Sequence, residues 1–209
     1  QRKEESDILM QIPMNLLKTD DMAILLQADK HSQLTIIERA MKIAKIFAID
    51  DERATKYKNH IIAQALITVL YSSATTDKKK DDIFSIINTC HTKEFNLDTQ
   101  IPGIGYTRSF SECFQIDSRG KFGEEVLITD YILKYIDEDL DIDESLANVT
   151  YDLKAFSKAL DFTLISEGFQ HNQNLHDDAV ILRVRLNSII NSKLSNYFTG
   201  AYIPVKDFI

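Results

Sequence analysis

The sequence contains few of the residues that interrupt regular structure. Only six glycines and three prolines occur among its 209 residues, whereas an average protein has a combined glycine and proline content of about 12%. Collagen-like chains and glycine- or proline-rich disordered chains are therefore excluded. The same scarcity favours long helices, because glycine and proline are the residues that most often end them.

Long apolar runs and clusters of cysteine are also missing. No segment approaches the roughly 18 consecutive apolar residues that indicate a membrane-spanning helix. Residues 1–7 are charged, whereas a secretory signal would need an apolar stretch close behind. Cys90 and Cys113 are the two cysteines, too few to demand a disulfide framework and without the spacing of a zinc site. We therefore expect a cytoplasmic protein without a membrane partner.

The balance of charge is acidic. The chain has 32 aspartates and glutamates against 24 lysines and arginines, a net charge of −8 at pH 7. This balance argues against a surface whose main task is to neutralise the phosphates of nucleic acid or of anionic lipid. Hydrophobic residues make up 44% of the chain, enough for one sizeable core at this length. We interpret residues 1–209 as a single domain.

Apolar residues recur at spacings of three and four along most of the chain, the pattern of amphipathic helices. The clearest stripe includes Ile37, Ala40 and Ala44. The predicted fold is all-α, a single compact domain of about six or seven helices. These helices are expected to begin near Thr19, Ser32, Asp51 or Glu52, Asp81, the residue after Gly123, Leu153, and Asn174.

Single residues predict how these helices begin, end and face the core. Residues 74–80 are polar and are expected to form a turn. Gly168 is placed as a C-terminal cap, and Asn174 as the N-terminal cap of the last helix. Helical spacing assigns to the core-facing sides Val126, Leu127, Tyr131, Leu133, Leu160, Leu182, Leu186 and Leu194.

Residues 96–123 interrupt the helical pattern. This stretch holds four of the six glycines and one of the three prolines, so an irregular region is expected there. Within it, residues 111–116 have the composition of a short strand or of a hairpin closed at residues 118–120.

A metal site is one hypothesis for catalysis. His176 and Asp177 are adjacent, as metal ligands are in helical phosphohydrolases, and His31, His60 and His171 are further candidate ligands. The dipeptide has a simpler explanation, because an aspartate near a helix start faces the positive end of the helix dipole. His171 and His176 are also not spaced as ligands on one helix face.

Other site patterns are incomplete. Asp139, Asp141 and Asp143 alternate like the first ligands of a calcium loop, but Glu144 occupies the position of its turn glycine. The sequence after Gly120 is Lys121 and then Phe122, which does not complete a phosphate-binding loop. No nucleophile-elbow motif or family-specific cysteine signature is present. We therefore assign no catalytic, nucleotide-binding or metal-binding residue.

Four arginines are candidates for contacts with phosphate or with a protein partner. Arg108 and Arg119 lie in the irregular stretch, and Arg183 and Arg185 lie in the last helix. A planar guanidinium binds phosphate with two parallel hydrogen bonds. Ion pairing with the many acidic residues is the simpler interpretation for each of them.

Two parts of the chain carry a resemblance to a known family. The first consists of Ile12, Pro13, Leu16, Leu17, Leu25, Leu26, Ser32, Gln33, Ile36, Ile37, Glu38, Arg39 and Ala40. The second consists of Ala159, Leu160, Asp161, Phe162, Leu164, Ile165, Ser166, Glu167, Gly168, Leu182, Arg183, Val184, Arg185, Leu186, Ser188, Ile189, Ile190, Asn191 and Ser192. Together they resemble the all-helical segment that bacterial HerA-like ATPases of the HerA/FtsK class carry between Walker A and Walker B.

The resemblance implies a helical subdomain of a ring-forming, usually hexameric motor. Such a motor couples ATP hydrolysis to DNA movement or to the remodelling of a nuclease or effector. ATP and magnesium would be bound by the parent protein and DNA would be contacted only through it, because both Walker motifs lie outside this chain. The expected partners are the remaining ATPase core and neighbouring subunits. The alternatives are a freestanding helical adaptor and, third, the metal-dependent phosphohydrolase described above.

Overall fold

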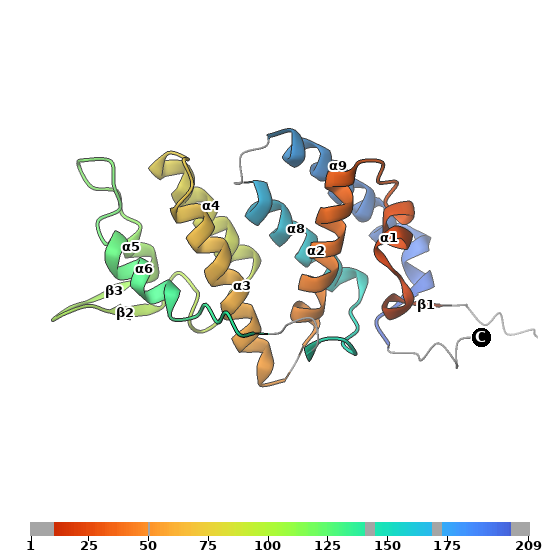
Figure 1. Ribbon diagram of the computed structural model, residues 1–209, viewed down its shortest axis with the longest axis horizontal. Helices are drawn as coiled ribbons and strands as arrows, with labels where there is room; N and C mark the ends of the chain where they lie inside the picture. The colour runs from red at the N-terminus through yellow and green to blue at the C-terminus, as the bar shows by residue number, and fades with distance from the viewer. Residues whose placement is uncertain (1–10, 50, 141–144, 169–172, 202–209) are drawn as a thin grey trace, which may run out of the picture.

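Figure 1 shows a molecule built mainly of helices. The computed structural model describes the backbone of residues 11–49, 51–140, 145–168 and 173–201, and the side chains of these residues except 167, 168 and 173–179. Within them it contains eight α-helices, two 3-10 helices and four short strands. The predicted all-α fold is confirmed, and the described residues contain eight α-helices where about six or seven were expected.

The element bounds are as follows. The α-helices are α1 (Thr19–Leu25), α2 (His31–Ala48), α3 (Arg53–Leu70), α4 (Thr76–Thr89), α5 (Phe110–Cys113), α6 (Glu125–Leu133), α8 (Leu153–Gly168) and α9 (Gln173–Ile190). The 3-10 helices are η1 (Met14–Leu16) and η2 (Lys193–Tyr197), and the strands are β1 (Ile12–Pro13), β2 (Gln100–Pro102), β3 (Thr107–Ser109) and β4 (Phe198–Thr199).

Helices α2 and α8 form the centre of one end of the molecule and pack extensively against each other. Both bury small residues, since Ala40 and Ala44 on α2 and Ala159 on α8 are closed to solvent. Small side chains let the axes of packed helices approach closely. Helix α1 packs against α2, and α9 packs against both central helices, so these four helices form one group (Figure 1).

The other end of the long axis is built from α3, α4, α5, α6 and the hairpin of β2 and β3 (Figure 1). Its core contains an aromatic cluster, which we define as Phe95, Phe110, Phe114, Phe122, Tyr131 and Tyr135. Neighbouring ring centroids lie 5.0–6.2 Å apart, most of them edge to face, the arrangement that aromatic rings favour. This cluster supplies the core for the irregular stretch 96–123.

Strands β1 and β4 bring two distant segments together. They pair in parallel, with Ile12 opposite Phe198 and Pro13 opposite Thr199. β1 lies at the end of the molecule away from the hairpin (Figure 1). The described helices include no candidate for a membrane-spanning segment.

Helix α4 begins earlier than expected. Residues 74–80 were expected to form a turn before a helix at Asp81, but α4 already starts at Thr76. The Thr75 hydroxyl caps it by accepting the Lys78 backbone N–H at 3.4 Å, and Asp77 lies in its first turn. An N-cap and an acidic first turn stabilise a helix start without any apolar periodicity. At the last helix, α9 begins at Gln173, so the expected cap Asn174 lies inside it.

The strand expected at 111–116 is replaced by helix α5. Ser109 and Glu112 form a capping box, in which the Ser109 hydroxyl accepts the Glu112 N–H and the Glu112 carboxylate accepts the Ser109 N–H. This reciprocal pair starts a helical turn. A closure near residues 118–120 does exist, as a single antiparallel bridge between Ile116 and Phe122.

Three side chains expected in the core are exposed. Val126 and Leu133 on α6 and Leu194 in η2 point to solvent, whereas Ile128 and Ile132 form the buried side of α6. α6 is only nine residues long, and in so short a helix apolar residues on all sides leave the buried face undetermined by spacing alone. The predicted core residues Leu160, Leu182 and Leu186 are buried.

Truncating the core leucines tests the packing of α8 and α9. We expect Leu160→Ala and Leu186→Ala each to lower the free energy of unfolding by about 2–5 kcal/mol, because both remove buried methyl groups and leave a cavity. Val184→Ala, on α9 with 63% of its surface exposed, is the matched control and should change it by less than about 0.5 kcal/mol. Urea denaturation measures all three. Equal stability of the three variants would contradict this packing.

Asp82 on α4 predicts a pH-dependent stability. Its side chain is nearly closed to solvent, and its Oδ2 lies 3.8 Å from Lys78 Nζ without a hydrogen bond from any described residue. Burial raises the pKa of this carboxyl to about 6, against an ordinary 3.8. The folded state therefore binds this proton more tightly than the unfolded state does. The stability that protonated Asp82 contributes is fully present below about pH 4 and is lost as the pH rises through 6.

We expect Asp82→Asn to remove this dependence. Relative to the variant, the native chain should lose of order 1–3 kcal/mol of stability between pH 4 and pH 7. Urea denaturation across that range measures the difference, and Asp98→Asn, at an exposed position outside the groove beside α6, should follow the native curve. Parallel pH curves for Asp82→Asn and the native chain would refute the prediction.

Candidate functional site

The hairpin of β2 and β3 is largely exposed to solvent. The strands are antiparallel, with Ile101 opposite Arg108. Residues 103–106 join them. Among these, Gly105 has φ +80°, a left-handed conformation that glycine adopts without steric cost. Ile104 is 100% exposed. The hairpin projects from one end of the molecule beside α5 and α6 (Figure 1).

Tyr106 fixes the hairpin to α6. Its ring lies against Gly103, where an added Cβ would be 2.7 Å from the ring. Its hydroxyl donates to Glu124 Oε2 at 2.8 Å, and Glu124 is the N-cap residue directly before α6. The Arg108 guanidinium lies over the same ring, 4.8 Å from the centroid, and its Nε is 3.4 Å from Glu124 Oε1. The hydrogen bond to Glu124 raises the pKa of Tyr106.

The outer edges of the hairpin are poor templates for another strand. In this register, the backbone hydrogen-bonding groups of four residues point away from the neighbouring strand: Gln100, Pro102, Thr107 and Ser109. Pro102 has no N–H, and the Ser109 N–H donates to the Glu112 carboxylate at 2.7 Å, which lowers the pKa of Glu112. Interrupted edges of this kind resist strand addition. A partner would therefore meet side chains here rather than a free strand edge.

A groove of about 800 Å³ runs between the hairpin and α6. Ile104 and Tyr106 border it on one side and Val126, 76% exposed, borders it on the other. Its rim carries charges of both signs. We call this region the hairpin surface and define it by Ile104, Tyr106, Lys121, Glu125, Val126, Asp130 and Lys134. Exposed apolar side chains framed by charged residues are typical of protein contact sites.

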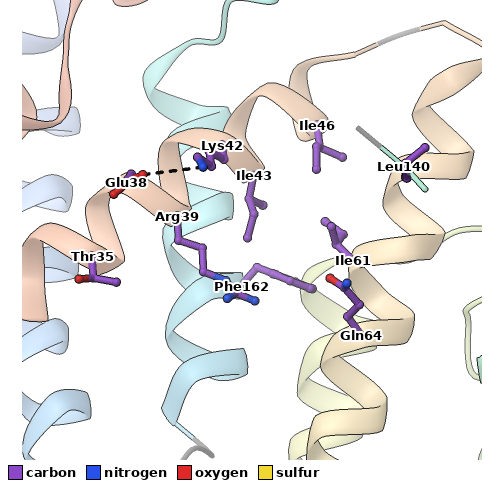
Figure 2. Close-up of a pocket in the computed structure, with 10 residues that line it drawn as sticks. All are labelled: Thr35, Glu38, Arg39, Lys42, Ile43, Ile46, Ile61, Gln64, Leu140 and Phe162. Carbon is purple, nitrogen blue, oxygen red and sulfur yellow. Dashed lines mark ion pairs between the residues drawn. The ribbon is translucent and has the colours of Figure 1, made fainter. Parts of the chain in front are cut away.

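A second hollow, of about 530 Å³, lies between α2 and α3 (Figure 2). Its apolar lining comes from Ile43 and Ile46 on α2, Ile61 on α3, Phe162 on α8, and Leu140. The charged rim includes an ion pair in which Lys42 Nζ lies 3.7 Å from Glu38 Oε1. The hollow is open to solvent. It offers apolar contact and one ion pair.

Arg108 and Arg119 lie at the hairpin end, each beside a carboxylate. Arg108 pairs with Glu124 as described, and Arg119 Nη2 lies 2.8 Å from Asp117 Oδ2. Asp117 also accepts the backbone N–H groups of Arg119 at 2.8 Å and Lys121 at 3.1 Å, which lowers its pKa. The backbone donors around Gly120 are thus bound by a side chain of the same loop.

Arg183 and Arg185 lie on α9, in the other group of helices. Arg183 Nε is 2.8 Å from Asp161 Oδ1 on α8. Arg185 donates to the carbonyl oxygens of Leu26 and Gln27, at the end of α1 where Gln27 has φ +53°. A cation at a helix C-terminus is favoured by the helix dipole. The structure therefore separates the four arginines into two pairs and gives each a partner within the chain.

The histidines of the metal hypothesis are not brought together where side chains are described. His31 is exposed at the start of α2. His60 is buried on α3, its Nδ1 accepts the Asp137 N–H at 3.1 Å, and burial lowers its pKa. Asp139 is exposed, and the remaining residues of the metal and calcium patterns lie outside the described residues or side chains: Asp141, Asp143, Glu144, His171, His176 and Asp177. Among described side chains, no group of three potential ligands could hold a metal ion.

The two cysteines are free and buried. Burial raises the pKa of the Cys113 thiol to about 11 and that of Cys90 to about 12. Both are therefore thiols at neutral pH, and the thiolate is the nucleophilic form of cysteine. Cys90 and Cys113 act as core residues.

No protein-family model matches this sequence, and no curated protein matches it with significant similarity.

The hairpin surface was not predicted from the sequence, although two signals for it are present. An isoleucine stands between Gly103 and Gly105, an unusual place for an apolar side chain, and Ser109 and Glu112 have capping-box spacing.

The bond between Tyr106 and Glu124 makes a testable prediction. We expect Glu124→Gln to lower the pKa of Tyr106 toward its ordinary value of 10, because the phenolate no longer forms next to a carboxylate. NMR titration with ¹³C-labelled tyrosine measures it, with Tyr106→Phe assigning the signal. Glu125→Gln, at the next and exposed position, is the control and should leave the titration unchanged. An unaltered Tyr106 pKa in Glu124→Gln would show that this contact does not form.

Proposed function

We propose that this chain is a non-catalytic helical module that acts through protein contacts, with the hairpin surface as its docking surface. The observation that carries the proposal is Ile104, fully exposed at a tip that Tyr106, Arg108 and Glu124 fix in place. Burying an isoleucine side chain gains about 1.5–3 kcal/mol. Because the tip is already fixed, little conformational entropy is lost when a partner covers it.

The parent that we propose is a bacterial HerA-like ring ATPase, usually hexameric, in the cytoplasm. The sequence resemblance supports this assignment. The pairing of Ile12 with Phe198 is compatible with it, because an inserted subdomain must leave and rejoin its host at neighbouring points. In this scheme the parent binds ATP, magnesium and DNA. The module contacts the ATPase core, neighbouring subunits, or a nuclease or effector.

A freestanding helical adaptor would use the same surface. Ile104 and Val126 would then bind a partner encoded elsewhere, without an ATPase in the same chain. The coding sequence upstream of Gln1 and downstream of Ile209 distinguishes the two proposals. Walker motifs on either side support the HerA-like parent, and an independent open reading frame supports the adaptor.

Nucleotide binding tests the non-catalytic role. We expect no saturable heat when ATP and magnesium are titrated into this chain in a calorimeter, because the backbone amides around Gly120 are held by Asp117. ATP hydrolysis should appear only when the segments with the Walker motifs are supplied. Saturable binding of ATP by the chain alone would overturn the proposal.

A further inference from the structure

The hairpin surface combines a protruding side chain and a recess on one face. Ile104 protrudes at the hairpin tip, and the groove between the hairpin and α6 lies beside it. Phe122, Leu127 and Tyr131 contribute to the lining of this groove. A partner with only an apolar protrusion would leave Ile104 in water, and a partner with only a recess would leave the groove open. A partner that has both an apolar protrusion and a recess would cover Ile104 and fill the groove at the same time.

The charges around the groove are balanced. Lys121 and Lys134 provide two positive charges, and Glu125 and Asp130 provide two negative charges. Two other cations near the groove, Arg108 and Arg119, already lie beside carboxylates of the chain. A strongly anionic partner such as nucleic acid would meet Glu125 and Asp130, and a strongly acidic or basic protein would likewise meet like charges. The balance matches a partner that carries both signs in equal number.

We propose that the partner of the hairpin surface is a second copy of this chain, related by a two-fold axis. In such an isologous contact the same patch is used on both copies. Ile104 of each copy enters the groove of the other, and the lysines of each rim meet the acids of the opposite rim. Since the strand edges are interrupted at Pro102 and Ser109, side chains rather than an added strand make the contact. This inference rests on the proposed function and names its partner.

Sedimentation equilibrium over a wide range of concentrations tests the contact. The native chain should show a reversible monomer–dimer equilibrium. Ile104→Asp should weaken the dimer about tenfold or more, because a charge replaces a central apolar contact. Ile24→Asp is the matched control, since Ile24 on α1 is 78% exposed and lies in the other group of helices. Its dimer constant should equal that of the native chain, and thermal melts check that both variants are folded.

A charge exchange tests the two-fold geometry independently of Ile104. One variant carries Glu125→Lys with Asp130→Lys, and the other carries Lys121→Glu with Lys134→Glu. Each alone should dimerise at least about tenfold more weakly, because like charges face each other across the axis. An equimolar mixture should recover a heterodimer, since the opposite signs are restored.

A chain that stays monomeric at every concentration would overturn this inference. So would a dimer that survives both Ile104→Asp and the charge exchanges, because it would form through another surface. Either result would leave the proposed contact role intact, since a different protein could still occupy the hairpin surface. ATP binding by the chain would instead overturn the proposed function. That result would not change the monomer–dimer equilibrium expected here.

Discussion

The packing of aromatic rings beneath the hairpin is the constraint on which the contact surface depends. The stretch 96–123 contains four glycines, so ordering its backbone carries a large entropic cost. Phe95, Phe110 and Phe114 offset that cost, because all three are closed to solvent and pack ring against ring. Tyr131 joins them from α6 and donates a hydrogen bond to the Glu94 carbonyl. Without this aromatic core, the hairpin that carries Ile104 would not be held in one conformation.

The rest of the fold provides a stable base at a distance from that surface. α2 and α8 bury alanines at the centre of the other helical group, and Arg185 binds the end of α1 there. Substitutions on the hairpin surface therefore lie away from the packed alanines of α2 and α8. The charges around Ile104 balance, although the chain as a whole has a net charge of −8.

The sequence was sufficient to predict the long helices, but not the surface. α2 and α8 are 18 and 16 residues long, so an apolar stripe repeats over several turns and identifies the buried face. The start of α4 was missed because Thr75 and Asp77 define it, without apolar spacing. Val126 was assigned to the core because apolar residues surround the short helix α6, and tertiary packing alone selects Ile128 and Ile132 for burial. The hairpin depends on rings that are far apart in sequence, and periodicity carries no information on such contacts.

The proposed two-fold contact constrains how a ring-forming parent would be assembled. A ring closes through head-to-tail contacts, in which two different surfaces of each subunit meet. An isologous contact at the hairpin uses one surface twice, so it cannot be the contact that closes the ring. It would join two modules across an axis of its own, either between two rings or between pairs of subunits. Ile12 pairs with Phe198 at the end of the molecule away from the hairpin. A parent joined at that end would leave the hairpin surface free to make the proposed contact.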